Sequence, residues 1–185
     1  MSVWHPLNAL PEGWPTGVAF VVILALLVFV GRKAKPDLAR EGVPHRNVVA
    51  LELAGDSIAA KHIIGNWEEH GLIGEVRRQL RWDAVFILAY STLTALACVI
   101  AARAFTCPLT DARRFALFVA WLPWLAGLLD YAENYAIYRM LGGFEGEMWP
   151  RLSASCAALK FAIIITLGLW GLAGVIIGAF RAVRC

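Results

Sequence analysis

Four long apolar segments alternate with shorter polar segments along the chain. The apolar segments cover about residues 15–31, 82–105, 115–138 and 152–180. The hydrocarbon core of a bilayer is about 30 Å thick, and a helix of about 20 apolar residues crosses it. The pattern therefore predicts an all-α integral membrane protein, a four-helix bundle that forms a single membrane domain over residues 1–185.

The region between the first two apolar segments, residues 36–81, has the composition of a water-exposed region. Asp56 or Ser57 is a suitable N-cap for a helix that continues to Trp67, and Gly71 is a suitable C-cap. The apolar residues of this helix favour one side. We expect a cytoplasmic or interfacial helical segment that lies on the membrane surface or against the end of the bundle.

The third apolar segment loses its apolar character early. Residues 115–129 are apolar throughout, but at the helical rise these fifteen residues reach only about 22 Å. The span must therefore include Asp130, Glu133 and Asn134, whose i, i+3, i+4 spacing places them on one helix face. A carboxylate at a helix centre costs about 2.5–3.5 kcal/mol, so this face should point towards partners or a wet cavity. Pro123 should kink the helix and leave a carbonyl that needs a partner.

Basic residues are distributed unevenly between the two sides of the predicted bundle. With alternating spans, eleven Lys and Arg residues lie on one side and five on the other. The positive-inside rule then places both termini outside and the two longer loops in the cytoplasm. Asp83, Asp130, Glu133 and Lys160 all fall in the cytoplasmic part of their spans. We predict that they share one polar pocket, which is also lined by Tyr90, Tyr131, Asn134, Tyr135 and Tyr138.

The charged residues within the spans allow two interpretations. Asp130, Glu133 and Lys160 can form a structural network, although polar contacts between membrane helices are worth only about 0.6–2 kcal/mol. Alternatively they form a functional pocket, which is the default interpretation of ionisable residues inside spans. Lys160 can also extend to the interface, and Asp83 can pair with an arginine there. The candidate catalytic residues are Asp130, Glu133 and Asp83, and the candidate ligand-binding residues are Asn134, Tyr90, Tyr131, Tyr135 and Lys160.

The composition of the chain limits the classes of partner and cofactor that we expect. The chain has 185 residues, of which 59% are hydrophobic, and its formal net charge is +3. The basic residues form no single block, so we expect the lipid bilayer and no nucleic acid as a partner. The four cysteines lie far apart without a C-x-x-C pair, and we expect no metal and no cofactor. Cys107 and Cys185 fall on the same side and could pair.

Three phrases of the sequence resemble a known family. These are AGDSIAAKHIIGNW at 54–67, WDAVFILAY at 82–90 and LLDYAEN at 128–134. They are similar to recurring phrases in a family of small bacterial four-span integral membrane proteins to which no activity is assigned. The resemblance covers about residues 51–134. It implies that Asp83, Asp130, Glu133 and Asn134 form one unit. We separately expect a location in the bacterial inner (plasma) membrane.

Three functions remain open at this point. The first is a binding or accessory membrane protein, which takes a lipophilic small molecule or a membrane protein partner; the pair Gly174 and Gly178 has the G-x-x-x-G spacing of close helix contacts. The second is an intramembrane acid–base enzyme of the isomerase, cyclase or hydratase type that acts on an isoprenoid or acyl substrate. It predicts an apolar cavity that reaches the carboxylates. The third is a component of proton-coupled transport.

Overall fold

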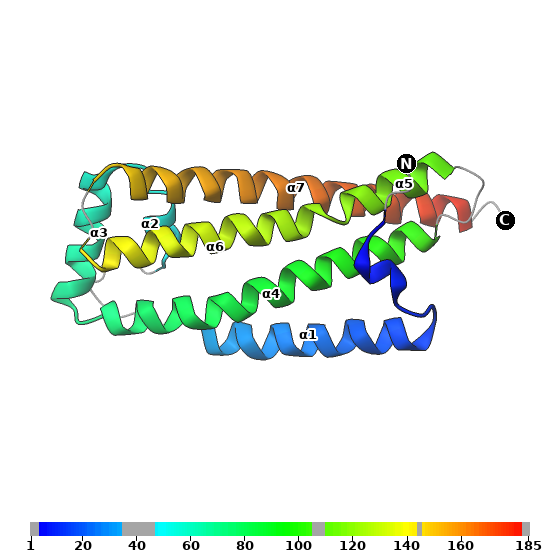
Figure 1. Ribbon diagram of the computed structural model, residues 1–185, viewed down its shortest axis with the longest axis horizontal. Coiled ribbons are helices and arrows are strands. Elements are labelled where there is room, and N and C mark those ends of the chain that lie inside the picture. Colours follow the sequence, from blue (N-terminus) through cyan, green and yellow to red (C-terminus); the bar gives the residue numbers. More distant parts are fainter. Residues whose placement is uncertain (1–3, 35–46, 105–109, 144–145, 183–185) are drawn as a thin grey trace.

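The protein is built from helices that differ greatly in length (Figure 1). The computed structural model describes residues 4–34, 47–104, 110–143 and 146–182, although the side chains of residues 104, 110–113 and 170–182 are outside the description. Over these ranges there is no strand. The elements are η1 (Pro6–Ala9), α1 (Trp14–Ala34), α2 (Val49–Glu52), α3 (Ser57–Glu69), α4 (Ile73–Ala104), α5 (Thr110–Val119), α6 (Leu122–Leu141) and α7 (Met148–Ala182).

Four helical stretches are long and apolar enough to cross a membrane, and this confirms the predicted all-α four-helix architecture. They are Trp14–Ala34, Ile73–Arg103, Arg114–Leu141 and Met148–Leu169. Neighbouring stretches run in opposite directions, so the bundle has two distinct ends (Figure 1). We call the end that carries α2 and α3 the α3 end and the end that carries η1 the η1 end.

Two of these helices differ in detail from the segments read from the sequence. The second begins at Ile73 rather than at Trp82, because residues 73–81 contain no proline and are rich in good helix formers. The third is broken after Val119 into α5 and α6. Pro123 lies in the first turn of α6, where its missing N–H is tolerated. The break is therefore the local effect that Pro123 was expected to have.

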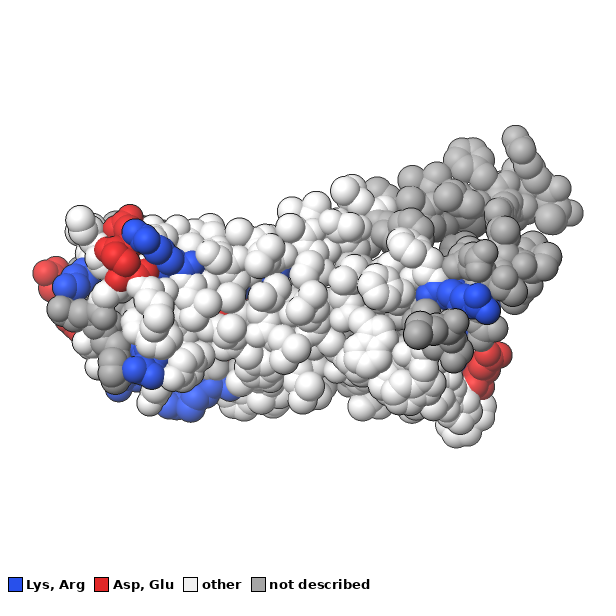
Figure 2. Space-filling view, turned by 45° about the horizontal axis from the view of Figure 1, so that its top comes forward, with Lys and Arg blue, Asp and Glu red and all other residues white. Residues whose placement is uncertain are grey.

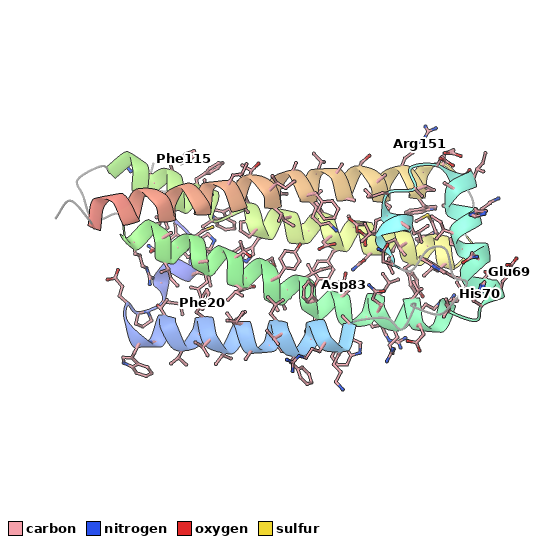
Figure 3. All side chains as sticks on the ribbon, turned by 180° about the vertical axis from the view of Figure 1, so that it is seen from behind. Phe20, Glu69, His70, Asp83, Phe115 and Arg151 are labelled. Atoms are coloured by element: carbon pink, nitrogen blue, oxygen red, sulfur yellow. The ribbon has the colours of Figure 1, made fainter. Side chains whose placement is uncertain are left out.

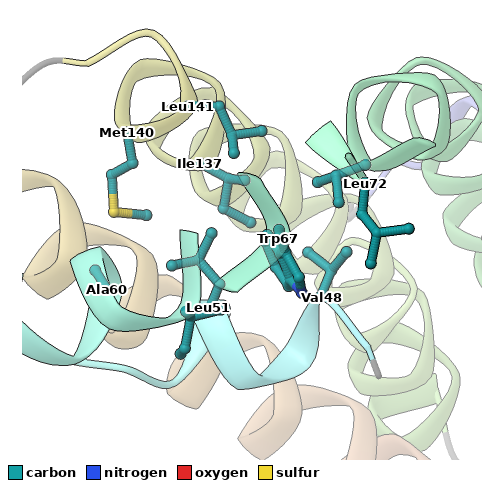
Figure 4. Packing of buried hydrophobic residues seen from close by; sticks show 10 residues of the cluster. Val48, Leu51, Ala60, Trp67, Leu72, Ile137, Met140 and Leu141 are labelled. Atoms are coloured by element: carbon teal, nitrogen blue, oxygen red, sulfur yellow. The ribbon is translucent and has the colours of Figure 1, made fainter. Parts of the chain in front are cut away.

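The α3 end is closed by the segment between the first two spans. The side chain of Asp56 caps α3 by accepting a 2.8 Å hydrogen bond from the amide of Ala59, and Gly71 follows the helix at φ +66°. Leu51 and Trp67 are fully buried and pack against Ile137 of α6 in one apolar cluster (Figure 4). The segment thus lies against the end of the bundle, one of the two placements expected.

The η1 end is closed by the N-terminal segment, residues 4–13. Arg103 of α4 donates to the carbonyls of Asn8 and Leu10 at 3.0 and 2.8 Å and to Thr16 Oγ1 at 3.2 Å. His5 is buried against two tryptophan rings at the start of α6. The ring centroids lie 5.0 Å from that of His5 for Trp121 and 4.8 Å for Trp124. The segment is therefore fastened to α4 by hydrogen bonds and to α6 by aromatic packing.

Charge is distributed in the way that a bilayer requires. On the face shown in Figure 2, acidic and basic residues gather at both ends of the molecule, and the surface between them is almost entirely uncharged. Asp130, Glu133 and Lys160 lie within this uncharged length but are buried inside the bundle. Cys107 and Cys185 fall outside the described residues, and Gly174 and Gly178 fall in the part of α7 whose side chains are outside the description.

Candidate functional site

A close approach of α4 and α6 brings the polar residues of these helices together. A Cβ atom added at Gly127 would lie 3.1 Å from the Cβ of Ser91, which is tighter than ordinary packing. Glycine at this position therefore allows the two backbones to approach. Tyr90 is the neighbour of Ser91, and Asp130 follows Gly127 by one helical turn. The approach thus sets the distance between these two side chains.

Lys160 of α7 lies at the centre of the cluster. Its Nζ atom is 2.8 Å from Oδ1 of Asp130, and it is 3.0 and 2.9 Å from the two oxygens of Glu133. The side chains are almost inaccessible, with exposed fractions of 7% for Lys160, 11% for Asp130 and 0% for Glu133. Buried charges are tolerated when they are paired and hydrogen-bonded, as these are. Lys160 therefore pairs inside the bundle and does not extend to the interface.

Two further hydrogen bonds connect α4 to the same face of α6. The hydroxyl of Tyr90 donates to Oδ2 of Asp130 at 2.8 Å. The amide of Asn134 donates to Oδ2 of Asp83 at 2.7 Å. Figure 3 places Asp83 well within the length of the bundle, whereas Glu69 and His70 lie at its extremity. The structure thus brings together side chains from α4, α6 and α7, as the sequence predicted.

Glu52 is a member of the cluster that the sequence reasoning missed. It ends the short helix α2, and its Oε2 atom lies 3.9 Å from Nζ of Lys160. Burial raises the pKa of Glu52, which Lys160 and a hydrogen bond to Glu133 partly offset. Its segment was assigned to water because of its polar composition. The signal that could have found it is local, because Val48 and Leu51 are apolar and buried beside it.

The cluster holds more acid than base. Glu52, Asp130 and Glu133 surround the single ammonium group of Lys160. The carboxyl groups of Glu52 and Glu133 lie close enough for each to influence the charge of the other. Burial also disfavours an excess of negative charge. The arrangement can therefore retain a proton and release it, which is the chemistry of an acid–base or proton-linked site.

Two candidate ligand-binding tyrosines lie away from the cluster. Tyr131 is 40% exposed and its hydroxyl donates to the carbonyl of Ala84. Tyr135 is 52% exposed, and its hydroxyl accepts a 2.7 Å hydrogen bond from Arg139. Tyr138 is likewise exposed. These side chains occupy the outer face of α6, and of the predicted tyrosines only Tyr90 joins the network.

An apolar cavity of about 350 Å³ lies between α4, α5, α6 and α7. Its wall is formed largely by small and aliphatic side chains, among them Ala97, Ala101, Ala126 and Leu167, and Gly168 contributes to it. Tyr90 also lines the cavity. Since the hydroxyl of Tyr90 is bonded to Asp130, this residue connects the cavity to the buried charges. An apolar cavity in contact with this network is the feature that an intramembrane enzyme or a lipophile-binding protein requires.

The donor set at the site is suited to protons and hydrogen bonds. Within the described residues, no group of three or more His, Cys, Asp and Glu side chains is arranged to hold a metal ion. Lys160 occupies the position between the carboxylates in which a cation would lie. The ammonium group of this lysine therefore supplies the positive charge at the site.

Comparisons with known proteins do not assign the chain to a family. The chain matches no protein-family model and no curated protein, and its fold matches no solved structure.

Proposed function

We propose that the protein binds a lipophilic molecule with a single apolar chain in the cavity between α4 and α7, with the polar end of the molecule at Tyr90. One observation carries this proposal. Tyr90 belongs both to the wall of an apolar cavity and to the buried network through Asp130. Binding sites for small molecules combine these two elements, a mainly apolar wall and a few fixed polar groups.

The size of the cavity limits the ligand. Its volume of about 350 Å³ lies at the lower end of the range for ligand pockets, roughly 300–1,000 Å³. A single acyl or isoprenoid chain suits this volume better than a phospholipid with two chains. The site is also enclosed by several helices, which would shield most of a bound chain from competing lipids.

The ion pairs behind Tyr90 support the proposal because they fix its position. Lys160 donates a hydrogen bond to Asp130, and Asp130 also accepts a hydrogen bond from the hydroxyl of Tyr90. A polar group that is already fixed loses little conformational entropy when a ligand binds. Preorganisation of the binding site would therefore explain why three charged side chains are kept buried despite the cost in stability.

The experiment measures binding to purified protein in phosphatidylcholine nanodiscs. Radiolabelled dodecanol and dodecanoate are used as probes, with binding referred to the amount of probe in the lipid. Gly168→Leu should abolish saturable binding by filling the cavity, since a Cβ atom at Gly168 meets no atom within 4 Å. Gly17→Leu on α1 is the matched control, because it also meets no atom and lies away from the cavity. Absence of saturable binding of both probes, or binding that survives Gly168→Leu, would disprove the proposal.

Acid–base catalysis on the same ligand is a second candidate. The chain of contacts from Tyr90 through Asp130 to Lys160 favours it, because a proton could pass along these groups. Asp130 and Glu133 do not line the cavity, so Tyr90 would contact the substrate and the carboxylates would act behind it. The test is to incubate the protein with farnesol and to analyse the extract by mass spectrometry. A product that is absent with Asp130→Asn would support catalysis, and recovery of unchanged farnesol would leave binding alone.

We also propose that the α3 end faces the cytoplasm of a bacterial cell. The basic residues that flank the spans are concentrated at this end, in keeping with the positive-inside rule. Fusions of alkaline phosphatase at the C-terminus and after residue 143 would test the orientation. The C-terminal fusion should be active and the fusion after residue 143 inactive; the opposite result would reverse the assignment.

A further inference from the structure

We infer that the cavity selects a lipophile whose polar end donates a hydrogen bond, namely a long-chain alcohol, and discriminates against carboxylate and phosphate groups. This inference rests on the proposed function and specifies its ligand. It follows from the direction of the hydrogen bonds made by the polar groups in the wall. Each of these groups offers a hydrogen-bond acceptor to a ligand, because it either donates its proton to another group of the protein or has no proton to donate.

Tyr90 is the first of these groups. Its hydroxyl carries one proton, and this proton is donated to Oδ2 of Asp130 at 2.8 Å. A hydroxyl oxygen keeps its lone pairs when its proton is engaged. The ion pair between Asp130 and Lys160 holds the accepting carboxylate in place. Tyr90 is therefore fixed as an acceptor for any ligand that reaches it.

Thr94 lies one turn further along α4 and also lines the cavity. Its hydroxyl donates to the carbonyl of Tyr90 at 2.8 Å. This bond uses its only proton within the helix, so Thr94 likewise offers lone pairs. The hydroxyl groups of Tyr90 and Thr94 thus both act as hydrogen-bond acceptors towards the cavity.

The break between α5 and α6 leaves a further backbone carbonyl group beside the cavity. Val119 and Pro123 both line the cavity. Residue 123 would normally donate its amide proton to the carbonyl of residue 119, but proline has no amide proton. The carbonyl of Val119 is therefore deprived of its usual helical partner. Cys98 is the remaining polar side chain among the described residues of this wall, and its thiol is only a weak donor.

The hydroxyl groups of Tyr90 and Thr94 determine which polar end is compatible. A carboxylate or phosphate needs donors, and it would find lone pairs instead, close to a network in which carboxylates outnumber the ammonium group. An ammonium end would meet acceptors, but burying its charge against neutral oxygens is costly. An alcohol is neutral and brings the one proton that the wall lacks. It is the polar end that this wall matches best.

The test compares four probes with the same chain: dodecanol, dodecylamine, dodecanoate and dodecyl phosphate. Their dissociation constants are measured in phosphatidylcholine nanodiscs and expressed as mole fractions in the lipid, so that differences in partitioning cancel. Dodecanol should bind at least about tenfold more tightly than dodecanoate and dodecyl phosphate, because a mismatched polar end leaves buried groups unsatisfied. Dodecylamine should also bind more weakly than dodecanol.

Two variants, the first with a matched control, test which residues cause the preference. Thr94→Val should weaken dodecanol binding by about fivefold, the loss of one hydrogen bond, and leave dodecanoate unchanged. Thr166→Val is its control, because the Thr166 hydroxyl makes the same bond to the carbonyl four residues before it and does not line the cavity. Asp130→Asn should reduce the preference for dodecanol, since an amide can donate to Tyr90 and free its proton for the ligand. Circular dichroism verifies that each variant is folded.

The outcomes separate this inference from the function on which it rests. Equal or tighter binding of dodecanoate or dodecyl phosphate overturns the inference and leaves the proposed function intact. A preference for dodecanol that persists unchanged in both Thr94→Val and Asp130→Asn also overturns it. Failure of all four probes to bind disproves the proposed function itself.

Discussion

Lys160 and Arg103 are two cations of the spanning helices, and their surroundings are opposite in kind. Lys160 lies among the carboxyl groups of Glu52, Asp130 and Glu133. Arg103 lies at the other end of the bundle and donates to neutral oxygens of Asn8, of Thr16 and of the backbone of the N-terminal segment. One cation is therefore surrounded by an excess of titratable acid, and the other by fixed dipoles.

The difference shows why an ionisable residue in a span need not indicate chemistry. The planar guanidinium of Arg103 has five donors and stays charged, so it can fasten a loop without changing its state. The cluster around Lys160 contains more carboxyl groups than the single charge of Lys160 can balance, and burial disfavours this excess of negative charge. Function is accordingly expected at the α3 side of the cavity, and a structural role at the η1 end.

Removal of Lys160 should have the largest effect. Lys160→Met keeps the length and apolar stem of the side chain but leaves the carboxylates of Asp130 and Glu133 buried without a cation. Removing one partner of a buried ion pair typically costs about 3–5 kcal/mol. We expect a corresponding loss in the free energy of unfolding, measured in detergent by denaturant titration.

A double variant distinguishes charge from packing as the cause of this loss. Lys160→Met combined with Glu133→Gln removes one uncompensated acid and should recover part of the lost stability. If the double variant is less stable than the wild type by the sum of the costs of the two single substitutions, the network is held by packing rather than by charge. The comparison with Arg103 would then lose its basis.

The sequence was sufficient to predict the helices and one polar face. The spacing of Asp130, Glu133 and Asn134 placed them together, and the structure agrees, because that spacing is a property of any α-helix. The sequence did not fix the rotation of α6. Tyr131, Tyr135 and Tyr138 have equally regular spacing and lie on the outer face. Two polar faces of one helix look alike until the neighbouring helices are known.

The apolar residues Val48 and Leu51 could have indicated that the segment of Glu52 is buried, but the partners that segments outside the spans contribute could not be assigned from the sequence. Glu52 and the N-terminal carbonyls reach the bundle only because the chain folds back over its ends. Their contacts with Lys160 and Arg103 connect residues about 100 positions apart, and nothing in local spacing encodes such pairs. The close approach at Gly127 was also hidden, since glycine is common in membrane helices for several reasons.

Substitution of Arg103 should have a smaller effect than loss of Lys160. Arg103→Gln leaves neutral oxygens without their donor, and at this end of the molecule water can replace part of what is lost. We expect a cost of about 2 kcal/mol, the scale of hydrogen bonds to a charged group. The loss should appear as faster maleimide labelling of Leu7→Cys in a variant without other cysteines. Lys33→Gln on α1 is the control and should leave the labelling rate unchanged; an effect of both substitutions would point to general destabilisation.

The docking of α2 at the α3 end should weaken as pH rises, because Glu52 loses its proton. Burial raises the pKa of Glu52, so the docked state of α2 favours the protonated form. Docking is therefore tightest below the ordinary glutamate pKa and weakens as pH rises towards the raised value, by at most about 1.4 kcal/mol per pH unit. Labelling of Leu51→Cys, corrected for the thiolate fraction of a free cysteine, should accelerate with pH. Glu52→Gln should remove this dependence and Glu69→Gln, at the exposed end of α3, should not.

The η1 end should respond to acid instead, with the smallest effect of the series. Nδ1 of His5 accepts a hydrogen bond from the amide of Leu7, so the buried ring is neutral with its proton on Nε2. Burial lowers the pKa of His5, and the nearby backbone of Ala120 partly offsets this shift. The contribution of His5 is complete above the ordinary histidine pKa near 6.5, and it declines as pH falls towards the lowered value.

Protonation of His5 would also turn its Nδ1 acceptor into a donor that faces the amide of Leu7. We expect the labelling of Leu7→Cys to accelerate below pH 6.5 by a few-fold, a change below about 1 kcal/mol. His5→Phe preserves the packing between Trp121 and Trp124 and should make the rate independent of pH after correction for the thiolate fraction. If both ends loosened in the same direction of pH, one common transition would explain them. Opposite responses would show that the two ends are held by independent chemistry.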